Sequence, residues 1–475
     1  MTRQVSSFSC HGQRGLTIIE LMVGLLVGMI VSIVLFSTLS VFEGRKRTST
    51  SVSDVNQSGN WAAYQIDKWV RSAGSGFAEA DGVIYGCKLK VYKAGAQILP
   101  LSSPAIALPA PFASVNSGSA KTFRVVPLMI YPGGSGDSTT GSSTASDALI
   151  IMGSTSPLGG AGTQLQAKFL SGSPPNLTLL SARGFAANDL LLIVNVDPNN
   201  LSAGCMVQQV DSSVTTFPSS TPQALKLNNT GSYYDSADLT PSSPLLPATG
   251  FDYDATSYNP NDQSTWCTST GTSGKCDSSS KLAVFNLGTI DLASTTNNPP
   301  VFLVLGVGSY NTLVGYDLFQ YQSPGAIFPI SDGVWEMHAL YGVDAVGSGT
   351  GPGKVTNWVT PTDQTGLCTW CTYSPASLTA TDASGKVTAT ALKAIRSIKA
   401  VRIALVMRTS LPEKSAVSNK AASGPSCSSA DGTTLAYFCD TAAAATRSLT
   451  GSEQNYRYRV IETVIPLRNG LMVPT

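Results

Sequence analysis

The residue that most invites a chemical explanation is Glu20, a carboxylate inside a long apolar segment. The segment, residues 13–36, is QRGLTIIELMVGLLVGMIVSIVLF, and Glu20 is its one acidic residue. A charge at the centre of a bilayer costs about 2.5–3.5 kcal/mol, so such residues are rare and usually have a role. A buried carboxylate is tolerated when an opposite charge pairs with it. We therefore expect Glu20 to do more than sit in an ordinary anchor.

Few other side chains could support catalysis. The sequence has two histidines, His11 and His338, so a Ser–His–acid triad would depend on His338, which has Glu336 two residues before it. No G-x-S-x-G elbow and no G-x-x-x-x-G-K-S/T phosphate loop occurs. We expect His338 to be an ordinary strand residue. The sequence predicts no enzyme, no catalytic residue, no metal site and no cofactor.

The cysteines indicate a disulfide framework. Nine are present, and all except Cys10 follow Gly15, which leaves an even set suited to an oxidising compartment. The C-x-x-C motif of Cys368 and Cys371 has two alternatives, a redox dithiol or a zinc site with Cys427 and Cys439. Proximity in the sequence favours three structural disulfides, Cys267–Cys276, Cys368–Cys371 and Cys427–Cys439. The two remaining cysteines would then form the long-range pair Cys87–Cys205.

Composition predicts a strand-and-loop body. The chain has 475 residues, of which 12 % are charged, and a formal charge of +1. Charged residues are about half as frequent as in an average domain, and Ser, Thr, Gly and Asn replace them. This balance gives no basic field for nucleic acid. We therefore expect no nucleic-acid partner.

The elements that position Glu20 form one long helix. Leu21 to Phe42 has no charged residue and is long enough to cross a hydrocarbon core of about 30 Å. Farther on, Val55, Ala62, Ile66 and other apolar residues recur at helical spacing and predict an amphipathic half. The helix is expected to cover residues 16–72, about 80 Å, and to end before Gly74.

Short strands and long loops are expected after the helix. Apolar or alternating runs bounded by Gly, Pro, Ser or Asn predict the strands, and Ser/Thr/Gly-rich tracts predict the loops. The expected strands are Thr122–Ile130, Ala148–Met152, Asp189–Val196, Met206–Val210, Leu282–Leu287, Val301–Val307, Ala400–Thr409 and Tyr456–Ile465. The expected loops are Gly133–Ser146, Ser212–Gln263 and Gly347–Thr362.

The N-terminus resembles the class III signal of type IV pilins and pseudopilins. A short basic leader ends in Gly15, Leu16 and Thr17 follow, and Glu20 is at the fifth position after the glycine. The resemblance implies cleavage between Gly15 and Leu16 by a prepilin peptidase and N-methylation of Leu16. Family members more often have Phe at that position. The new amine would be four residues from Glu20 on the same helix face. The resemblance implies that Glu20 pairs with the amine of an adjacent subunit and sets its register, the alternative being a pair within the chain.

Most of the chain also resembles the PilW-type minor pilins. The resemblance rests on seven motifs that follow one another in the same order as in the family. They are Arg71-Ser72-Ala73-Gly74, Ser146-Asp147-Ala148-Leu149, Asp189-Leu190-Leu191-Leu192, Phe285-Asn286-Leu287-Gly288, Tyr341-Gly342-Val343-Asp344, Val401–Arg408 and Val464–Asn469. After Asp344 the turn AVGSGTGPG has no further acidic residue, which argues against a calcium loop. The implied fold is α+β and pilin-like: a leader at 1–15, a helix at 16–72 with a membrane half and an amphipathic half, and a large β-rich domain with long loops at 73–475.

The implied function is that of a minor pilin, which primes filament assembly and lies at or near the pilus tip. The implied partners are other minor pilins, the major pilin, the prepilin peptidase, the inner-membrane assembly platform and a large tip adhesin, with the membrane contacted through the helix. Before assembly the chain would be a single-pass inner-membrane protein with a periplasmic body, and afterwards part of an extracellular pilus. Two alternatives are a type II secretion pseudopilin and a tip adhesin that binds surfaces or DNA.

Overall fold

The computed structural model describes most of the N-terminal helix and the strands that follow it. It forms two compact units, residues 1–54 and 55–475, and each is described by itself. The described residues are 17–77, 80–93, 96–99, 108–115, 123–136, 146–156, 162–164, 176–195, 205–212, 223–227, 282–290, 297–320, 325–345, 353–382, 386–417, 426–427 and 432–469.

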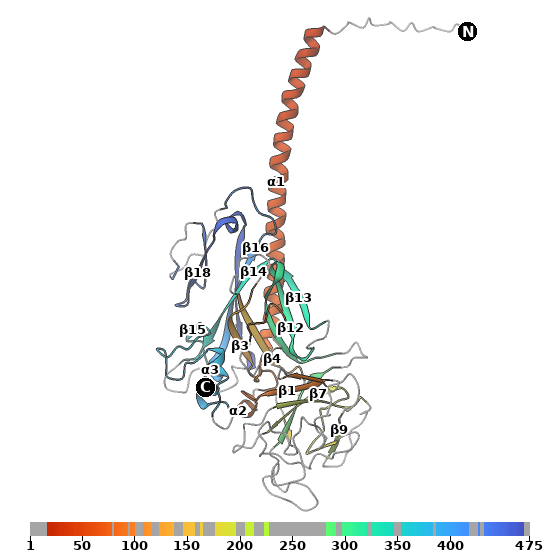
Figure 1. The fold of residues 1–475 in the computed structure, drawn as a ribbon, viewed down its shortest axis with the longest axis vertical. Helices are drawn as coiled ribbons and strands as arrows, with labels where there is room; N and C mark the ends of the chain where they lie inside the picture. The colour runs from red at the N-terminus through yellow and green to blue at the C-terminus, as the bar shows by residue number, and fades with distance from the viewer. Residues whose placement is uncertain are drawn as a thin grey trace, which may run out of the picture. The chain divides into compact units, whose positions relative to one another are not determined.

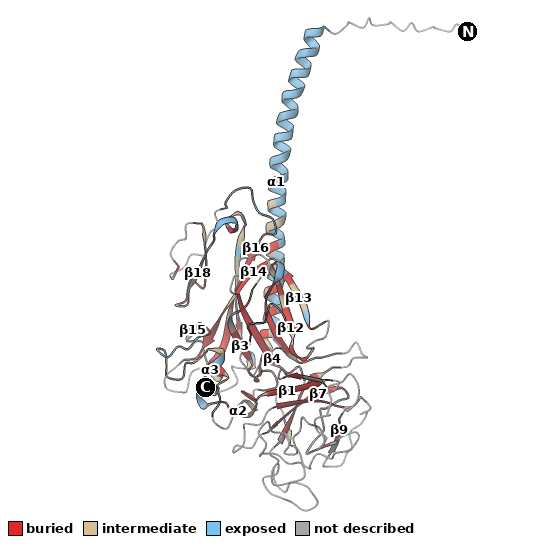
Figure 2. Ribbon diagram, in the orientation of Figure 1, coloured by how far each residue is buried: buried red, intermediate tan, exposed pale blue. Residues whose placement is uncertain are grey.

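Helix α1 covers Ile18–Arg71 and has two chemically different halves (Figures 1 and 2). The large apolar side chains between Ile18 and Phe42 are all more than half exposed. In the second unit the helix buries one stripe, Val55, Gly59, Ala62, Ile66 and Val70, at the spacing expected for an amphipathic helix. Gly59 permits the closest approach, because a Cβ there would lie 2.3 Å from the Ile461 side chain.

The four-stranded sheet lies against this stripe. Its order is β15 (Asn357–Val359), β14 (Val334–Val343), β16 (Ile398–Arg408) and β19 (Tyr458–Pro466), all antiparallel. Alternate side chains of β16 face opposite sides, so Leu405 and Met407 join the core around α1. Ala404 and Val406 join a second cluster. The hairpin of β17 (Thr434–Tyr437) and β18 (Ala445–Ser448) supplies Leu435 and Tyr437 to that cluster.

Two further sheets complete the second unit. The five-stranded sheet is antiparallel, in the order β13 (Ile327–Asp332), β12 (Thr312–Asp317), β11 (Val301–Gly308), β4 (Ser146–Gly153) and β3 (Leu128–Ser135). The six-stranded sheet runs β2 (Ala96–Leu99), β1 (Leu89–Lys93), β8 (Cys205–Gln209), β7 (Asp189–Asn195), β10 (Leu282–Thr289) and β5 (Thr163–Gln164). A pair of β6 (Asn176–Leu179) and β9 (Gln223–Lys226) accompanies it. One continuous cluster of buried apolar residues includes members of α1 and of all three large sheets.

The remaining helices are short. They are α2 (Asp81–Ile84), α3 (Pro375–Leu378), α4 (Ala389–Ser397), η5 (Ser309–Asn311), η6 (Leu318–Gln320) and η7 (Gly451–Asn455). Helix α4 begins at a conventional cap, because the Thr388 side chain accepts a hydrogen bond from the Ala391 N–H. It leads directly into β16, the central strand of the four-stranded sheet.

The α+β, pilin-like architecture predicted from the sequence is confirmed, with three corrections. The strand expected at Thr122–Ile130 begins only at Leu128. Pro127 has no N–H to donate to a ladder, and the backbone of Arg124 pairs with that of Lys88 as an isolated β-bridge outside the named strands. Strands β9 and β15 occur inside two segments that were expected to be loops.

Candidate functional site

The first turn of α1 holds Glu20. Thr17 lies just before the helix, and its hydroxyl accepts a hydrogen bond from the Glu20 N–H at 3.3 Å. Thr-x-x-Glu is the pattern of a capping box, in which the threonine hydroxyl accepts a hydrogen bond from the backbone N–H three residues later. A carboxylate in the first turn is also favoured by the positive end of the helix dipole. The Thr17 side chain thus caps the start of the helix, a role that the Thr-x-x-Glu motif indicates and that the sequence reading above did not assign.

The proposed processing site adjoins this turn. Gly15 and Leu16 lie outside the described residues, so cleavage after Gly15, N-methylation of Leu16 and the pairing of its amine with Glu20 stay predictions. Glu20 itself is exposed in the single chain.

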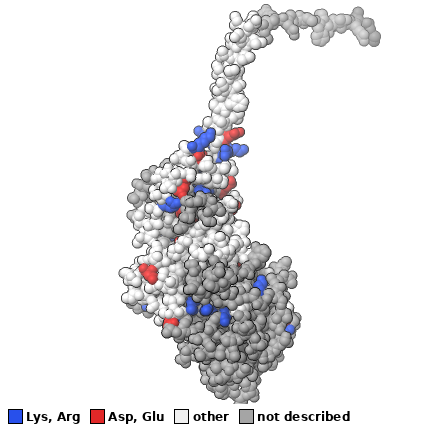
Figure 3. Space-filling view, viewed as in Figure 1, with Lys and Arg blue, Asp and Glu red and all other residues white. Residues whose placement is uncertain are grey.

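The apolar half of α1 has the composition of a membrane span. An 18-residue window within α1 has a mean hydropathy of 2.7, and none of it is buried. On the face seen in Figure 3 this stretch is free of charged side chains, which gather where it ends. Gly24 and Gly28 have open space around them, because nothing lies within 4 Å of a Cβ built at either position. Their G-x-x-x-G spacing is compatible with close helix packing as well as with local softening of the helix.

Three disulfides are present in the described residues. They are Cys87–Cys205, Cys368–Cys371 and Cys427–Cys439, with Cα–Cα distances of 5.7, 5.1 and 5.0 Å. The sequence favoured Cys368–Cys371 and Cys427–Cys439 because the two cysteines of each pair are close in the chain, and Cys87–Cys205 as the remaining pair. The fourth expected pair, Cys267–Cys276, lies outside the described residues. Among the described residues no group of three or more His, Cys, Asp or Glu is placed to hold a metal ion.

His338 is the one histidine in the described part of the chain, and it sits in a charged cluster. Its Nε2 lies 3.1 Å from Glu336 Oε2, and its Nδ1 lies 4.0 Å from Asp147 Oδ2. Its ring stacks on Tyr437 of the β17–β18 hairpin at 4.7 Å. The neighbouring Ser146 hydroxyl is hydrogen-bonded to the backbone of Met337. These contacts connect β14 to β4 and to the β17–β18 hairpin, so they indicate a structural role for the cluster.

Asp147 lies at the centre of this cluster. Its Oδ2 accepts a hydrogen bond from the Ala339 N–H of β14 at 2.9 Å, and its Oδ1 accepts one from the Gly133 N–H of β3 at 3.2 Å. One side chain of β4 thus links the four-stranded and five-stranded sheets. Burial raises the pKa of Asp147, and the nearby His338 and the two N–H donors oppose that rise.

Two of the motifs that carried the resemblance form contacts of this structural kind. The buried Tyr341 hydroxyl accepts a hydrogen bond from the Ile130 N–H at 2.6 Å, which ties β14 to β3. Asn286 donates to Asp189 Oδ2 at 2.7 Å, so two segments about a hundred residues apart in the sequence meet. These motif residues hold strands together.

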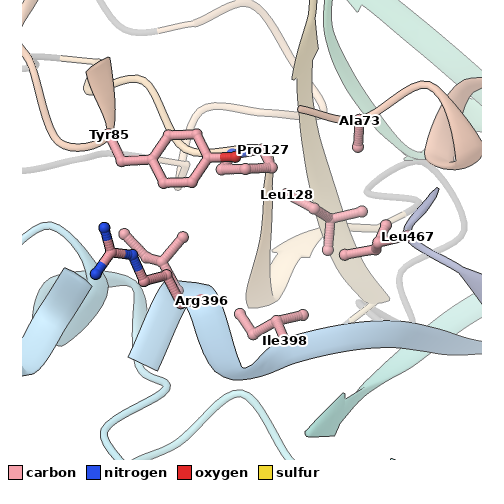
Figure 4. Close-up of a pocket in the computed structure, with 8 residues that line it drawn as sticks. Ala73, Tyr85, Pro127, Leu128, Arg396, Ile398 and Leu467 are labelled. Carbon is pink, nitrogen blue, oxygen red and sulfur yellow. The ribbon is translucent and has the colours of Figure 1, made fainter. Parts of the chain in front are cut away.

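One small cavity lies beside the end of α1 (Figure 4). It is lined by Ala73, Tyr85, Leu128, Arg396 and Leu467, among others. Its volume is about 10 Å³, roughly the room needed for one water molecule. It is too small for an organic ligand.

Comparison with protein-family models gives two matches. Residues 307–469 match the family described as type IV pilus-assembly protein W, and residues 10–36 match the prokaryotic N-terminal methylation motif. These two matches support a type IV pilin of the PilW type. Neither curated proteins nor solved structures give a match.

Both matches fall on parts already described. The PilW match begins at the end of β11 and covers β12 to β19, which include the whole four-stranded sheet. The strands of the six-stranded sheet all precede it. The methylation motif contains Gly15, Leu16 and Glu20. Together with the exposed apolar helix it supports membrane anchoring before assembly. Membership in a pilus-assembly family implies contact with other pilus components and a structural role.

Proposed function

We propose that this PilW-type pilin is a minor pilin that primes pilus assembly and ends up at or near the filament tip. The observation that carries the proposal is the combination of a methylation motif and an apolar helix whose large side chains are more than half exposed with a very large second unit, residues 55–475. The helix can enter a filament core, whereas a body of about four hundred residues would crowd a shaft. An end position leaves room for it.

Processing at the N-terminus is part of the proposal. A prepilin peptidase would cut between Gly15 and Leu16, and Leu16 would then be N-methylated. Glu20 would pair with the N-terminal amine of an adjacent pilin, because an uncompensated carboxylate among packed apolar helices is costly. Before assembly the body would lie in the periplasm, where Cys87–Cys205 and the other disulfides form. The assembly platform, the major pilin, other minor pilins and a large tip adhesin are the proposed partners.

Substitution of Glu20 tests the charge pairing. Glu20→Gln can still act in a capping box but has no charge, so we expect Glu20→Gln and Glu20→Ala both to be processed normally and to lower pilus number at least tenfold. Pili counted by electron microscopy, with N-terminal mass spectrometry of the mature chain, measure both effects. Glu43→Ala is the matched control, since Glu43 is another carboxylate of α1. Normal piliation with Glu20→Gln would refute the pairing.

The tip position has its own test. An epitope tag in the body, labelled with gold particles, should mark filament ends, and deletion of the chain should reduce pilus number more than pilus length. Particles spread along the shaft would contradict the position while leaving the pilin assignment intact. The description of the matched family as a pilus-assembly protein favours a pilus over a secretion pseudopilus.

A further inference from the structure

A groove in the second unit lies between α1 and the edge strand β13. Its walls include Gln57, Asn60, Trp61 and Tyr64 of the helix and Asp332 of the strand, and its volume is about 590 Å³. That is within the range of about 300–1,000 Å³ typical of small-ligand sites. We propose that this α1–β13 groove binds a neutral oligosaccharide. The proposal goes beyond pilus assembly and does not depend on a tip position.

Two aromatic rings form the floor for such a ligand. Trp61 is 51 % exposed and Tyr64 is 59 % exposed, whereas the core stripe of α1 is made by Ala62, Ile66 and their periodic neighbours. The two ring centroids are 5.9 Å apart, with a tilt of 34°. The fold does not need these rings for its core. Pyranose rings have an apolar C–H face that packs on aromatic rings, so exposed rings of this kind suit a sugar.

The polar side chains supply what sugar hydroxyls require. Gln57 and Asn60 each offer an amide donor and acceptor, and the exposed Asp332 offers a carboxylate acceptor. A hydroxyl both donates and accepts, so mixed groups of this type can bind several at once. The eight residues that line the groove include no lysine or arginine. Phosphate, nucleic acid and acidic sugars therefore lack a counter-charge here.

The walls of the groove are held before any ligand arrives. The Ser331 hydroxyl donates to the Ser58 carbonyl oxygen at 2.8 Å and ties β13 to the helix. The Thr312 hydroxyl lies 3.2 Å from Asp332 Oδ1 and orients that carboxylate. A site fixed in this way loses less entropy when it binds.

A protein partner fits the groove less well. The core of a protein–protein interface is apolar and depleted of charge, whereas five of the eight residues that line the groove are polar or charged: Gln57, Ser58, Asn60, Ser331 and Asp332. Aromatic faces edged by amides and a carboxylate match the alternating apolar and hydroxyl surfaces of a sugar better.

Binding of the full chain to defined sugars tests the proposal. The protein is kept in a zwitterionic detergent, because glycosidic detergents would compete for the groove. It is applied to immobilised trimers of glucose and of N-acetylglucosamine and to sialylated oligosaccharides. We expect saturable binding to at least one neutral sugar and none specific to the acidic ones. Trp61→Ala and Tyr64→Ala should each weaken binding at least tenfold, and Trp61→Phe should retain part of it.

Leu411→Ala is the control, since Leu411 is also exposed but does not line the groove. It should bind like the unchanged protein, and circular dichroism should show that all variants fold. The proposal is overturned if no neutral sugar binds, or if binding survives Trp61→Ala. It is also overturned if Trp61 becomes protected from chemical oxidation only when pili assemble, without any sugar binding. In that case the groove is a contact with another pilin.

Discussion

At the scale of single residues, Asp147 shows how a carboxylate can serve the fold instead of chemistry. It lies between His338 and two backbone N–H groups that belong to different sheets. Buried N–H groups need a partner, and each costs about 1–3 kcal/mol when it is left without one. Asp147 supplies an acceptor to one buried N–H, that of Ala339, and to the N–H of the exposed Gly133, at the junction of β3, β4 and β14.

Removal of this acceptor should destabilise the body. We expect Asp147→Ala to lower the free energy of unfolding by about 1–3 kcal/mol, because the buried Ala339 N–H loses its acceptor, whereas the exposed Gly133 N–H can bond to water instead. Asp147→Asn keeps one carbonyl oxygen and should cost less. Urea denaturation of the full chain, followed by near-UV circular dichroism, measures both. Equal stability of the Ala variant and the unchanged protein would exclude this role.

The same carboxylate predicts a pH dependence. Burial raises the pKa of Asp147 above its ordinary value of 3.8, so the folded state binds this proton more tightly than the unfolded state does. Its stabilising contribution is complete below about pH 3.8 and is lost as pH rises through the folded pKa. Stability relative to Asp147→Asn should therefore fall as the pH rises above about 4. Repeating the comparison with His338→Gln in both proteins removes the imidazole beside Asp147. A stability difference that does not change with pH would contradict the expectation.

At the scale of elements, the β17–β18 hairpin is attached to the four-stranded sheet by charge as well as by apolar packing. Arg447 of β18 lies 3.0 Å from Glu336 Oε1 on β14 and 3.1 Å from Glu453 Oε1. Its guanidinium also lies 5.1 Å from the Trp335 ring. The Glu336 side chain is only 3 % exposed, so it depends on such partners.

Arg447→Met should loosen the hairpin. We expect a loss of about 2–3 kcal/mol, because the buried Glu336 carboxylate loses its hydrogen bond from the Arg447 guanidinium and a charged hydrogen bond is worth about that much. Amide exchange in β17 should become faster than exchange in β14. Arg457→Met is the matched control, because its pair with Glu413 is 43 % and 32 % exposed and should be worth at most about 1 kcal/mol. Similar losses in the two variants would argue against a special role for Arg447.

At the scale of the whole molecule, disulfides join segments that are far apart in the sequence. Cys87–Cys205 closes a separation of 118 residues, whereas Cys427–Cys439 closes only 12. The first bond joins the neighbouring strands β1 and β8 at their start, next to the Leu89–Cys205 register pair. A long closed loop restricts the unfolded chain more than a short one does.

The two bonds should therefore differ in their effect on stability. In the chain-entropy model, replacing both Cys87 and Cys205 by alanine should cost about 5 kcal/mol, and replacing Cys427 and Cys439 about 3 kcal/mol. Alanine is used because these sites are buried and a serine hydroxyl would add a desolvation cost. Thermal unfolding without reductant compares the two variants. A larger loss for the short loop would show that strain or local packing, not chain entropy, sets their contributions.

The sequence by itself determined the long helix, the β-rich body, the pilin class and several core strands. These features rest on local patterns: charge-free length, helical periodicity and the order of short motifs. It placed His338 in a strand but gave no bounds for β14, because Glu336 and His338 interrupt its apolar run. Their burial depends on Asp147 and Arg447, which come from distant strands. The α1–β13 groove likewise joins Trp61 to Asp332. Tertiary structure alone decided these sites, because side chains hundreds of residues apart become partners only after the sheets pack.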